Sequence, residues 1–152
     1  MNRTYYEPNP ADGIPIRSAS CGWNATALDS IKRDVDGITL SVYPTYDAEH
    51  PLRVYVLLGR TSKTVGLDSE KVEVRYGDNA AGIRPATTSV KDAGPYVFKS
   101  IDYGFALPPN ANEIAIMFLP GFIKLDGRDI EITQFRFRRV TKSDVYYGSI
   151  NC

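Results

Sequence analysis

The stretch that decides the fold runs from Asn112 to Val140 and reads NEIAIMFLPGFIKLDGRDIEITQFRFRRV. Apolar side chains recur in it at every second position, and turn residues separate its two alternating parts. Because successive side chains of a strand point to opposite faces of a sheet, this period predicts strands with one buried face. The expected buried set is Ile114, Ile116, Phe118, Ile130, Ile132, Phe135 and Phe137.

Two features of this stretch predict how its strands are connected. Asp126-Gly127 lies between two strand-like runs and is a strong signal for a hairpin with a two-residue turn. The two phenylalanines at 135 and 137 are out of phase with the two isoleucines at 130 and 132. One extra residue in a strand produces such a phase change, so we place a β-bulge at Thr133-Gln134.

Other alternating runs occur along the rest of the chain. They predict strands over residues 38–42, 52–58, 71–76 and 96–107. The irregular segment 77–95 is expected to be a long loop with one edge strand near Thr87–Lys91. Between residues 25 and 35, Leu28, Ile31 and Val35 recur at helical spacing, and Gly37 would stop a helix there. A short helix near residues 25–35 is therefore part of the expectation.

The predicted fold class is all-β, because about seven to nine strands follow one another without alternating helices or a fixed repeat. We expect a two-sheet antiparallel β-sandwich of immunoglobulin-like architecture, with a Greek-key barrel as the alternative. The chain has 152 residues, which suits one domain. Residues 1–20 contain three prolines and predict an extended N-terminal arm, either docked through Tyr5 and Tyr6 or disordered. Residues 21–152 are then the single sandwich domain.

The two cysteines, Cys21 and Cys152, flank this domain and are a candidate disulfide. A bridge between them would close a loop of about 130 residues and stabilise the fold by ~4–5 kcal/mol. Disulfides belong to oxidising compartments, so we expect a periplasmic, cell-envelope or secreted protein whose export signal is not in this chain. A cytoplasmic protein with two free thiols is the alternative. No apolar run reaches the ~18 residues of a membrane span, so no transmembrane segment is predicted.

Charge and motifs argue against several functional classes. Eighteen basic residues balance eighteen acidic ones, so no long-range field favours nucleic acid. His50 is the only histidine, too few for a zinc site with the distant cysteines, and no phosphate-binding glycine motif occurs. We expect no cofactor, no metal and no enzymatic activity. A hydrolase would need two acidic side chains in one deep cleft.

Two kinds of side chain remain as candidates for binding a partner. Tyrosine is enriched at recognition surfaces, and the tyrosines in or near loops are Tyr43, Tyr46, Tyr146 and Tyr147. Arg136 and Arg138 share the outward face of a predicted strand. They could meet an acidic partner, or pair with acidic neighbours on an adjacent strand such as Glu113 or Glu73.

The predicted function is therefore a non-enzymatic binding or structural module of the bacterial cell envelope. It would contact a protein partner through loops and aromatic residues. The alternative is a carbohydrate-binding module in which exposed tyrosines and Trp23 stack on sugar rings. No pattern in the sequence points to a particular oligomeric state.

Overall fold

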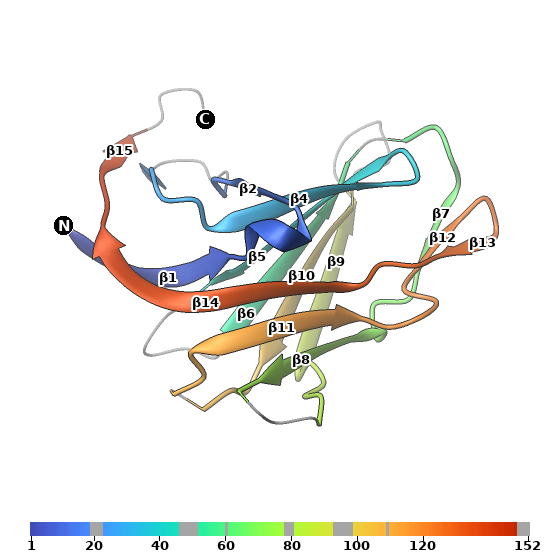
Figure 1. Cartoon of the computed structure of the whole chain (residues 1–152). Coiled ribbons are helices and arrows are strands. Elements are labelled where there is room, and N and C mark those ends of the chain that lie inside the picture. The colour runs from blue at the N-terminus through green and yellow to red at the C-terminus, as the bar shows by residue number, and fades with distance from the viewer. Residues whose placement is uncertain are drawn as a thin grey trace.

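The computed structural model describes residues 1–18, 23–45, 52–59, 61–77, 81–92, 99–108 and 110–148. These residues form a β-sandwich in which every paired strand is antiparallel, so the predicted fold class is confirmed (Figure 1). They include fifteen strands, more than the seven to nine expected, because several strands have only three residues. The immunoglobulin-like character of the sandwich stays a prediction.

The front layer in Figure 1 is a four-stranded sheet of order β1-β14-β11-β8. Its strands are β1 (Asn2–Pro8), β14 (Gln134–Ser143), β11 (Glu113–Phe118) and β8 (Val72–Tyr76). Behind it lies a six-stranded sheet of order β2-β4-β5-β6-β10-β9. Its strands are β2 (Ile14–Ile16), β4 (Ser30–Val35), β5 (Ile38–Thr45), β6 (Leu52–Leu58), β10 (Lys99–Phe105) and β9 (Thr87–Asp92).

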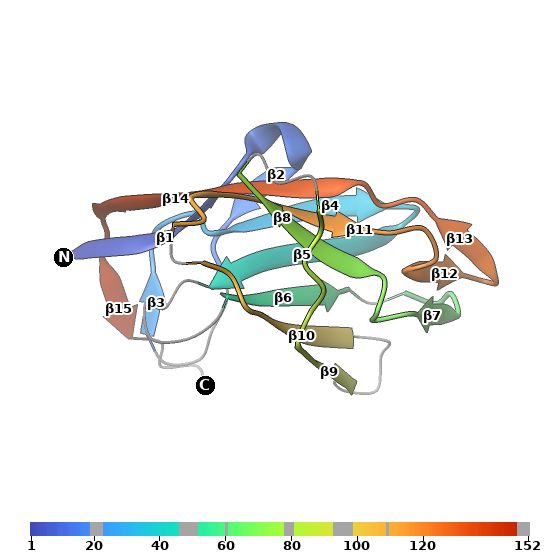
Figure 2. The same cartoon turned by 90° about the horizontal axis from the view of Figure 1, so that it is seen from below.

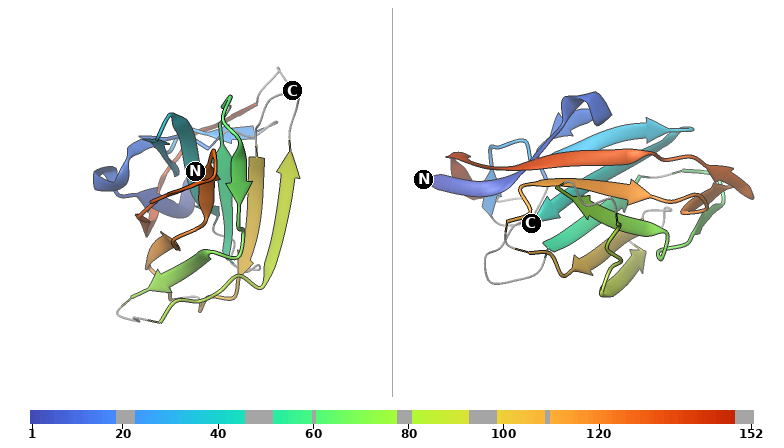
Figure 3. Two further views of the ribbon diagram at one scale, coloured as in Figure 1. Left: turned by 90° about the vertical axis from the view of Figure 1, so that its right-hand side faces the viewer. Right: turned by 60° about the horizontal axis from the view of Figure 1, so that its bottom comes forward.

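Two small sheets extend the sandwich at its ends. One has the order β13-β12-β7 and is built from Arg128–Ile130, Ile123–Leu125 and Val65–Leu67. The other pairs β15 (Tyr146–Gly148) with β3 (Trp23–Ala25). Figure 2 shows these additions at opposite ends of the molecule, and both Figure 2 and Figure 3 show β9 at the free margin of the six-stranded sheet.

The hydrophobic core lies between the two large sheets. The seven side chains of the Asn112–Val140 stretch that were expected to be buried are all buried, which confirms the period-two interpretation. Phe118 packs against both Phe122 and Phe135, with ring centroids 4.6 and 5.6 Å apart. Burying a large apolar side chain contributes about 1.5–3 kcal/mol, so this aromatic group contributes substantially to the stability of the core.

The expected bulge at Thr133-Gln134 is wrong, because the chain changes sheets there. β13 ends at Ile130 and pairs with β12, whereas β14 begins at Gln134 and pairs with β1 and β11. The three residues between these strands form no ladder, although Ile132 among them is buried. The phase change in the sequence thus marks the boundary between two strands of different sheets.

The helix expected near residues 25–35 is also wrong. Within that range, Ser30–Val35 is strand β4, which pairs with β5 through a two-residue turn at Asp36-Gly37. Both turn residues have positive φ, as at Asp126-Gly127, where the predicted hairpin is confirmed. Such turns match the twist of paired strands. Leu28, which completed the helical spacing, is exposed rather than part of the core.

Strand β5 is longer than the predicted 38–42, because it continues through Pro44 to Thr45. Its pairing with β4 ends at Val42, whereas its pairing with β6 continues to Thr45. Proline cannot donate a backbone hydrogen bond and is accepted where a strand has a partner on one side only. Tyr43 therefore lies on a sheet and not in a loop.

Residues 2–8 are extended and form β1, which is hydrogen-bonded along β14 from Asn2 to Pro8. Tyr5 and Tyr6 are buried, and the Tyr6 hydroxyl donates to the backbone oxygen of Ala111 at 2.9 Å. The segment is thus an edge strand of the four-stranded sheet.

Four residues singled out in the sequence lie outside the described part of the chain: Cys21, Cys152, Tyr46 and His50. Among the described residues, no helix has the length and apolar character needed to cross a membrane.

Candidate functional site

The outer face of the four-stranded sheet carries two rows of facing side chains. In the first, Arg138 of β14 lies between Glu7 of β1 and Glu113 of β11. In the second, Ala115 of β11 lies between Arg136 of β14 and Arg75 of β8. Because directly opposite residues share a face, all of these side chains project away from the core. The small Ala115 between two long arginines leaves the sheet hollow at that point.

A groove of about 750 Å³ follows these rows across the sheet. Its charged lining consists of Glu7, Arg75, Glu113, Arg136 and Arg138. Its apolar lining includes Pro8 at the end of β1, and Pro10, Pro15 and Leu28 from the segments that follow β1. We call this feature the outer groove. Leu28 is 47% exposed, so the apolar end is open to a partner.

Arg136 is held in place by Asp12, the last residue of the 3-10 helix η1 (Pro10–Asp12). Its Nε and Nη2 donate to the two carboxylate oxygens at 2.9 and 2.8 Å, and its backbone N–H donates to Oδ2 at 2.8 Å. Burial acts to raise the pKa of Asp12, but the hydrogen bonds and charge of Arg136 outweigh it and hold that pKa below its usual value. The Arg136 side chain remains 43% exposed and borders the groove.

Arg33 fixes η1 from the other sheet. Its guanidinium carbon lies 4.0 Å from the centroid of the Phe135 ring, and its Nε donates to the backbone oxygen of Asp12 at 2.8 Å. Its Nη2 donates to the backbone oxygen of Gln134 at 3.0 Å. The groove wall at η1 is therefore tied to both β4 and β14, so it is preorganised for binding.

Three further ion pairs order the charged lining. Glu7 accepts hydrogen bonds from Lys142 at 2.8 Å and from Arg138 at 3.3 Å. The hydrogen bond from Lys142 is the main cause that lowers the pKa of Glu7, against the opposing effect of burial, and Arg138 adds to it. Arg75 donates twice to Oε1 of Glu73, at 3.1 and 2.7 Å, and keeps 44% of its side chain exposed.

The described tyrosine candidates do not line this groove. Tyr43 stacks on Tyr55 of β6, with centroids 4.9 Å apart and planes inclined by 20°. Burial raises the pKa of the Tyr43 hydroxyl, and Tyr55 adds to the shift. Tyr146 and Tyr147 are exposed on β15, where Arg17 donates to the Tyr147 hydroxyl at 2.7 Å. The tyrosines thus lie on different elements from the arginines.

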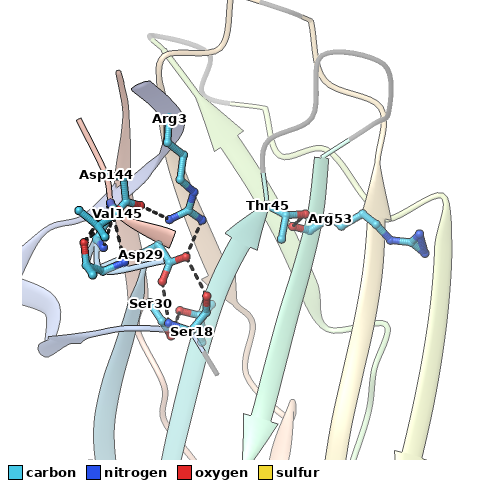
Figure 4. Close-up of polar contacts among 11 residues, drawn as sticks. Arg3, Ser18, Asp29, Ser30, Thr45, Arg53, Asp144 and Val145 are labelled. Carbon is cyan, nitrogen blue, oxygen red and sulfur yellow. Dashed lines mark hydrogen bonds and ion pairs between the residues drawn. The ribbon is translucent and has the colours of Figure 1, made fainter. Parts of the chain in front are cut away.

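A buried polar cluster, which the sequence did not suggest, joins β1 to the segment before β4 and to the residue after β14. Figure 4 shows Arg3 between two acids, donating to Asp29 at 2.8 Å and to Asp144 at 3.3 Å. Oδ1 of Asp144 also accepts from Thr26 and from the backbone N–H groups of Ala27 and Val145. Asp29 accepts two further bonds from Ser18.

This cluster is built for holding segments together. Burial acts to raise the pKa of Asp144, but the hydrogen bonds from Thr26, Val145 and Arg3 outweigh it and lower that pKa. A general acid needs a raised pKa, so Asp144, which shares Arg3 with Asp29, gives no support to the hydrolase hypothesis. Their hydrogen bonds instead connect β1, β14 and the residues before β4.

Among the predicted site residues that the structure describes, Arg136 and Arg138 both line the outer groove, and their partners are Asp12 and Glu7. Glu113 is the cross-strand neighbour of Arg138, as one of the sequence interpretations supposed. Ala115, Leu28 and the prolines of the apolar end were not predicted, because no local pattern reports which segments meet across a sheet edge.

Within the described ranges, no group of three or more histidine, cysteine or acidic side chains could hold a metal ion. Comparisons with protein-family models, with curated proteins and with solved structures find no match to this chain.

Proposed function

We propose that this protein is a non-enzymatic binding module of the bacterial cell envelope, and that the outer groove holds an extended segment of a protein partner. The observation that carries this proposal is the row Arg136–Ala115–Arg75, in which two partly exposed arginines flank a hollow floor. The envelope location is supported by the sequence alone, through the two cysteines.

The lining determines which segment would fit. Arg75 and Arg136 can each offer charge-assisted hydrogen bonds to a carboxylate in the hollow over Ala115. The apolar end at Pro8, Pro15 and Leu28 would bury apolar side chains of the same segment. The expected ligand is thus an extended peptide with acidic residues at one end and apolar residues at the other.

The groove has the preorganisation that binding requires. Two hydrogen bonds to Asp12 fix the Arg136 guanidinium, so little side-chain freedom remains to be lost when a ligand arrives. Because the Arg136 side chain is still partly exposed, it can bind a ligand without breaking its ion pair with Asp12.

The carbohydrate-binding alternative has less support. A sugar platform needs aromatic rings that lie side by side and expose their faces. Tyr43 and Tyr55 instead stack on each other, and they lie on the six-stranded sheet.

A peptide-display selection tests the proposal. Random peptides are selected on the wild-type chain and then measured against Ala115→Trp, which fills the floor from the solvent side. We expect enriched peptides with acidic and apolar residues that bind Ala115→Trp at least roughly tenfold more weakly. Their affinity for the wild-type chain should also fall with added salt, because the arginine contacts are near the surface.

The matched control is Ser41→Trp, an equal increase in size on the outer face of β5 in the other sheet. It should bind the selected peptides like the wild-type chain. The proposal is contradicted if no peptide is enriched, or if the enriched peptides bind Ala115→Trp and wild type equally.

A further inference from the structure

The two large sheets end in four edge strands, and three of these edges are protected. β1 ends in Pro8 and lies against β4 and β5. β2 has three residues, one of them Pro15. The free side of β8 is covered where Val74 and Ile83 exchange two backbone hydrogen bonds of 3.0 and 2.9 Å. Prolines, short strands and covering segments are the usual means of preventing edge-to-edge pairing.

The fourth edge, β9, has none of these three protections among the described residues, although it carries the charged Lys91. It is six residues long, Thr87–Asp92, contains no proline, and follows β10 in unbroken register from Thr87 to Asp92. No described strand pairs with its other side. A strand of this kind presents a row of backbone donors and acceptors to another chain.

Val90 adds an apolar feature to this edge. It lies directly opposite Ile101, which is fully buried, so Val90 points to the same inner face of the sheet. Val90 itself is 49% exposed, in contrast to the fully buried Ile101. The edge therefore offers both unpaired backbone groups and an uncovered side chain.

We propose that β9 pairs antiparallel with β9 of a second copy of this chain, about a two-fold axis through Val90. The two six-stranded sheets then become one continuous sheet. Each Val90 lies beside its counterpart and covers it, Ser89 faces Lys91, and Thr88 faces Asp92.

The position of the axis follows from symmetry and charge. A two-fold axis normal to the sheet keeps each side chain on its own face, so residues that lie opposite each other must share a face. This requires one residue of β9 to lie opposite its own copy, and the axis passes between these two copies. An axis through Lys91 would put two positive charges opposite each other, which is destabilising. An axis through Ser89 would separate the two Val90 side chains. Val90 is the position that avoids like charges and buries the apolar pair.

The proposed dimer has one consequence that also rests on the proposed function of the outer groove. A two-fold axis normal to the sheet leaves both four-stranded sheets on the same side, so the two outer grooves would face the same way. A partner with two suitable segments would then bind both, with a gain from effective concentration.

Sedimentation equilibrium of the full chain over a wide concentration range tests the dimer without reference to the groove. We expect the mass to approach twice that of the chain. Val90→Lys places two positive charges opposite each other and should raise the dimer dissociation constant roughly tenfold or more. The matched control Val145→Lys makes the same change at an exposed residue of another region and should leave the dimer unchanged.

A cross-linking measurement guards against misfolding of the lysine variant. With Val90→Cys, mild oxidation should produce a covalent dimer beyond the wild-type background, because the two introduced thiols would lie opposite each other. Val145→Cys should not. A wild-type mass of one chain at every concentration overturns the inference, as does an equal effect of the two lysine variants or the absence of a Val90→Cys dimer. These results do not depend on whether the groove binds peptides.

Discussion

Tyr103 lies on the inner face of β10 with its whole side chain buried, and its hydroxyl has no hydrogen-bond partner among the described residues. Burial raises the pKa of this hydroxyl, and the charge of Asp68 adds to the shift. A buried polar group without a partner loses its hydration and gains nothing in return. The Tyr103 hydroxyl thus lowers the stability of the fold, whereas its ring contributes to the core.

Tyr103→Phe should therefore raise the free energy of unfolding by about 1 kcal/mol, measured by urea denaturation. Tyr6→Phe is the matched control, because the buried Tyr6 hydroxyl does have a partner, the backbone oxygen of Ala111. That variant should lose about 1 kcal/mol. Equal effects of the two substitutions would contradict the distinction between a paired and an unpaired hydroxyl.

The connection between β1 and β2 carries the chain from one large sheet to the other and forms the wall of the outer groove. Asn9 caps η1 by accepting a hydrogen bond from the backbone N–H of Ala11 at 2.9 Å, and Gly13 follows the helix. A Cβ atom at Gly13 would lie 2.6 Å from the backbone oxygen of Lys32. The close approach of β4 leaves no room for any side chain there.

Gly13→Ala should consequently lower the free energy of unfolding by roughly 1–3 kcal/mol, as overpacking does. Gly66→Ala is the control, since a Cβ atom in β7 would meet the nearest atom of Lys124 at an ordinary 3.5 Å. Its effect should be small. The measurement is thermal or urea unfolding of both variants, and a neutral Gly13→Ala would show that β2 and β4 can separate without cost.

Acid stability involves the whole molecule, because the affected carboxylates join distant segments. Asp12, Asp144 and Glu7 all have lowered pKa values in the folded state. The unfolded chain therefore binds more protons than the folded one when the pH falls below the ordinary values of 3.8 for aspartate and 4.5 for glutamate. Their stabilisation is complete above these values and is lost as the pH falls through the lower folded pKa values.

Asp144→Asn should reveal how much of the stability depends on the ionised Asp144 carboxylate. The Asp144 side chain is 1% exposed and accepts hydrogen bonds from four residues, so the variant should lose about 3 kcal/mol near neutral pH. The difference from wild type should shrink as the pH falls from 3.8 toward the lower folded pKa of Asp144, because the unfolded wild-type chain then binds a proton that the folded protein does not yet accept. The exposed Asp129→Asn should change stability by less than about 0.5 kcal/mol. If urea denaturation gave the same difference in unfolding free energy between Asp144→Asn and wild type at every pH, the lowered pKa assigned to Asp144 would be contradicted.

Local patterns predicted much of the fold and little of the candidate site. Alternation identified the buried residues of β11 and β14, and Asp126-Gly127 identified a hairpin. Asp36-Gly37 carries the same hairpin signal. In the structure the hairpin forms there, and the helix suggested by the spacing of Leu28, Ile31 and Val35 does not. Arg136 and Arg138 were correctly placed on an outward face, but the groove beside them depends on Ala115 and on Leu28, which no motif marks.

The sequence alone determined the all-β class, the inward faces of β11 and β14 and the Asp126-Gly127 turn, because these depend on neighbouring residues and on the burial of apolar side chains. Only the tertiary structure decided that Asp12 meets Arg136, that Arg3 joins Asp29 and Asp144, and that β9 is an open edge. Each of these depends on which strands lie side by side. Such pairings connect residues far apart in the chain, 26 positions for Arg3 and Asp29 and 124 for Arg136 and Asp12, and a local pattern carries no information about them.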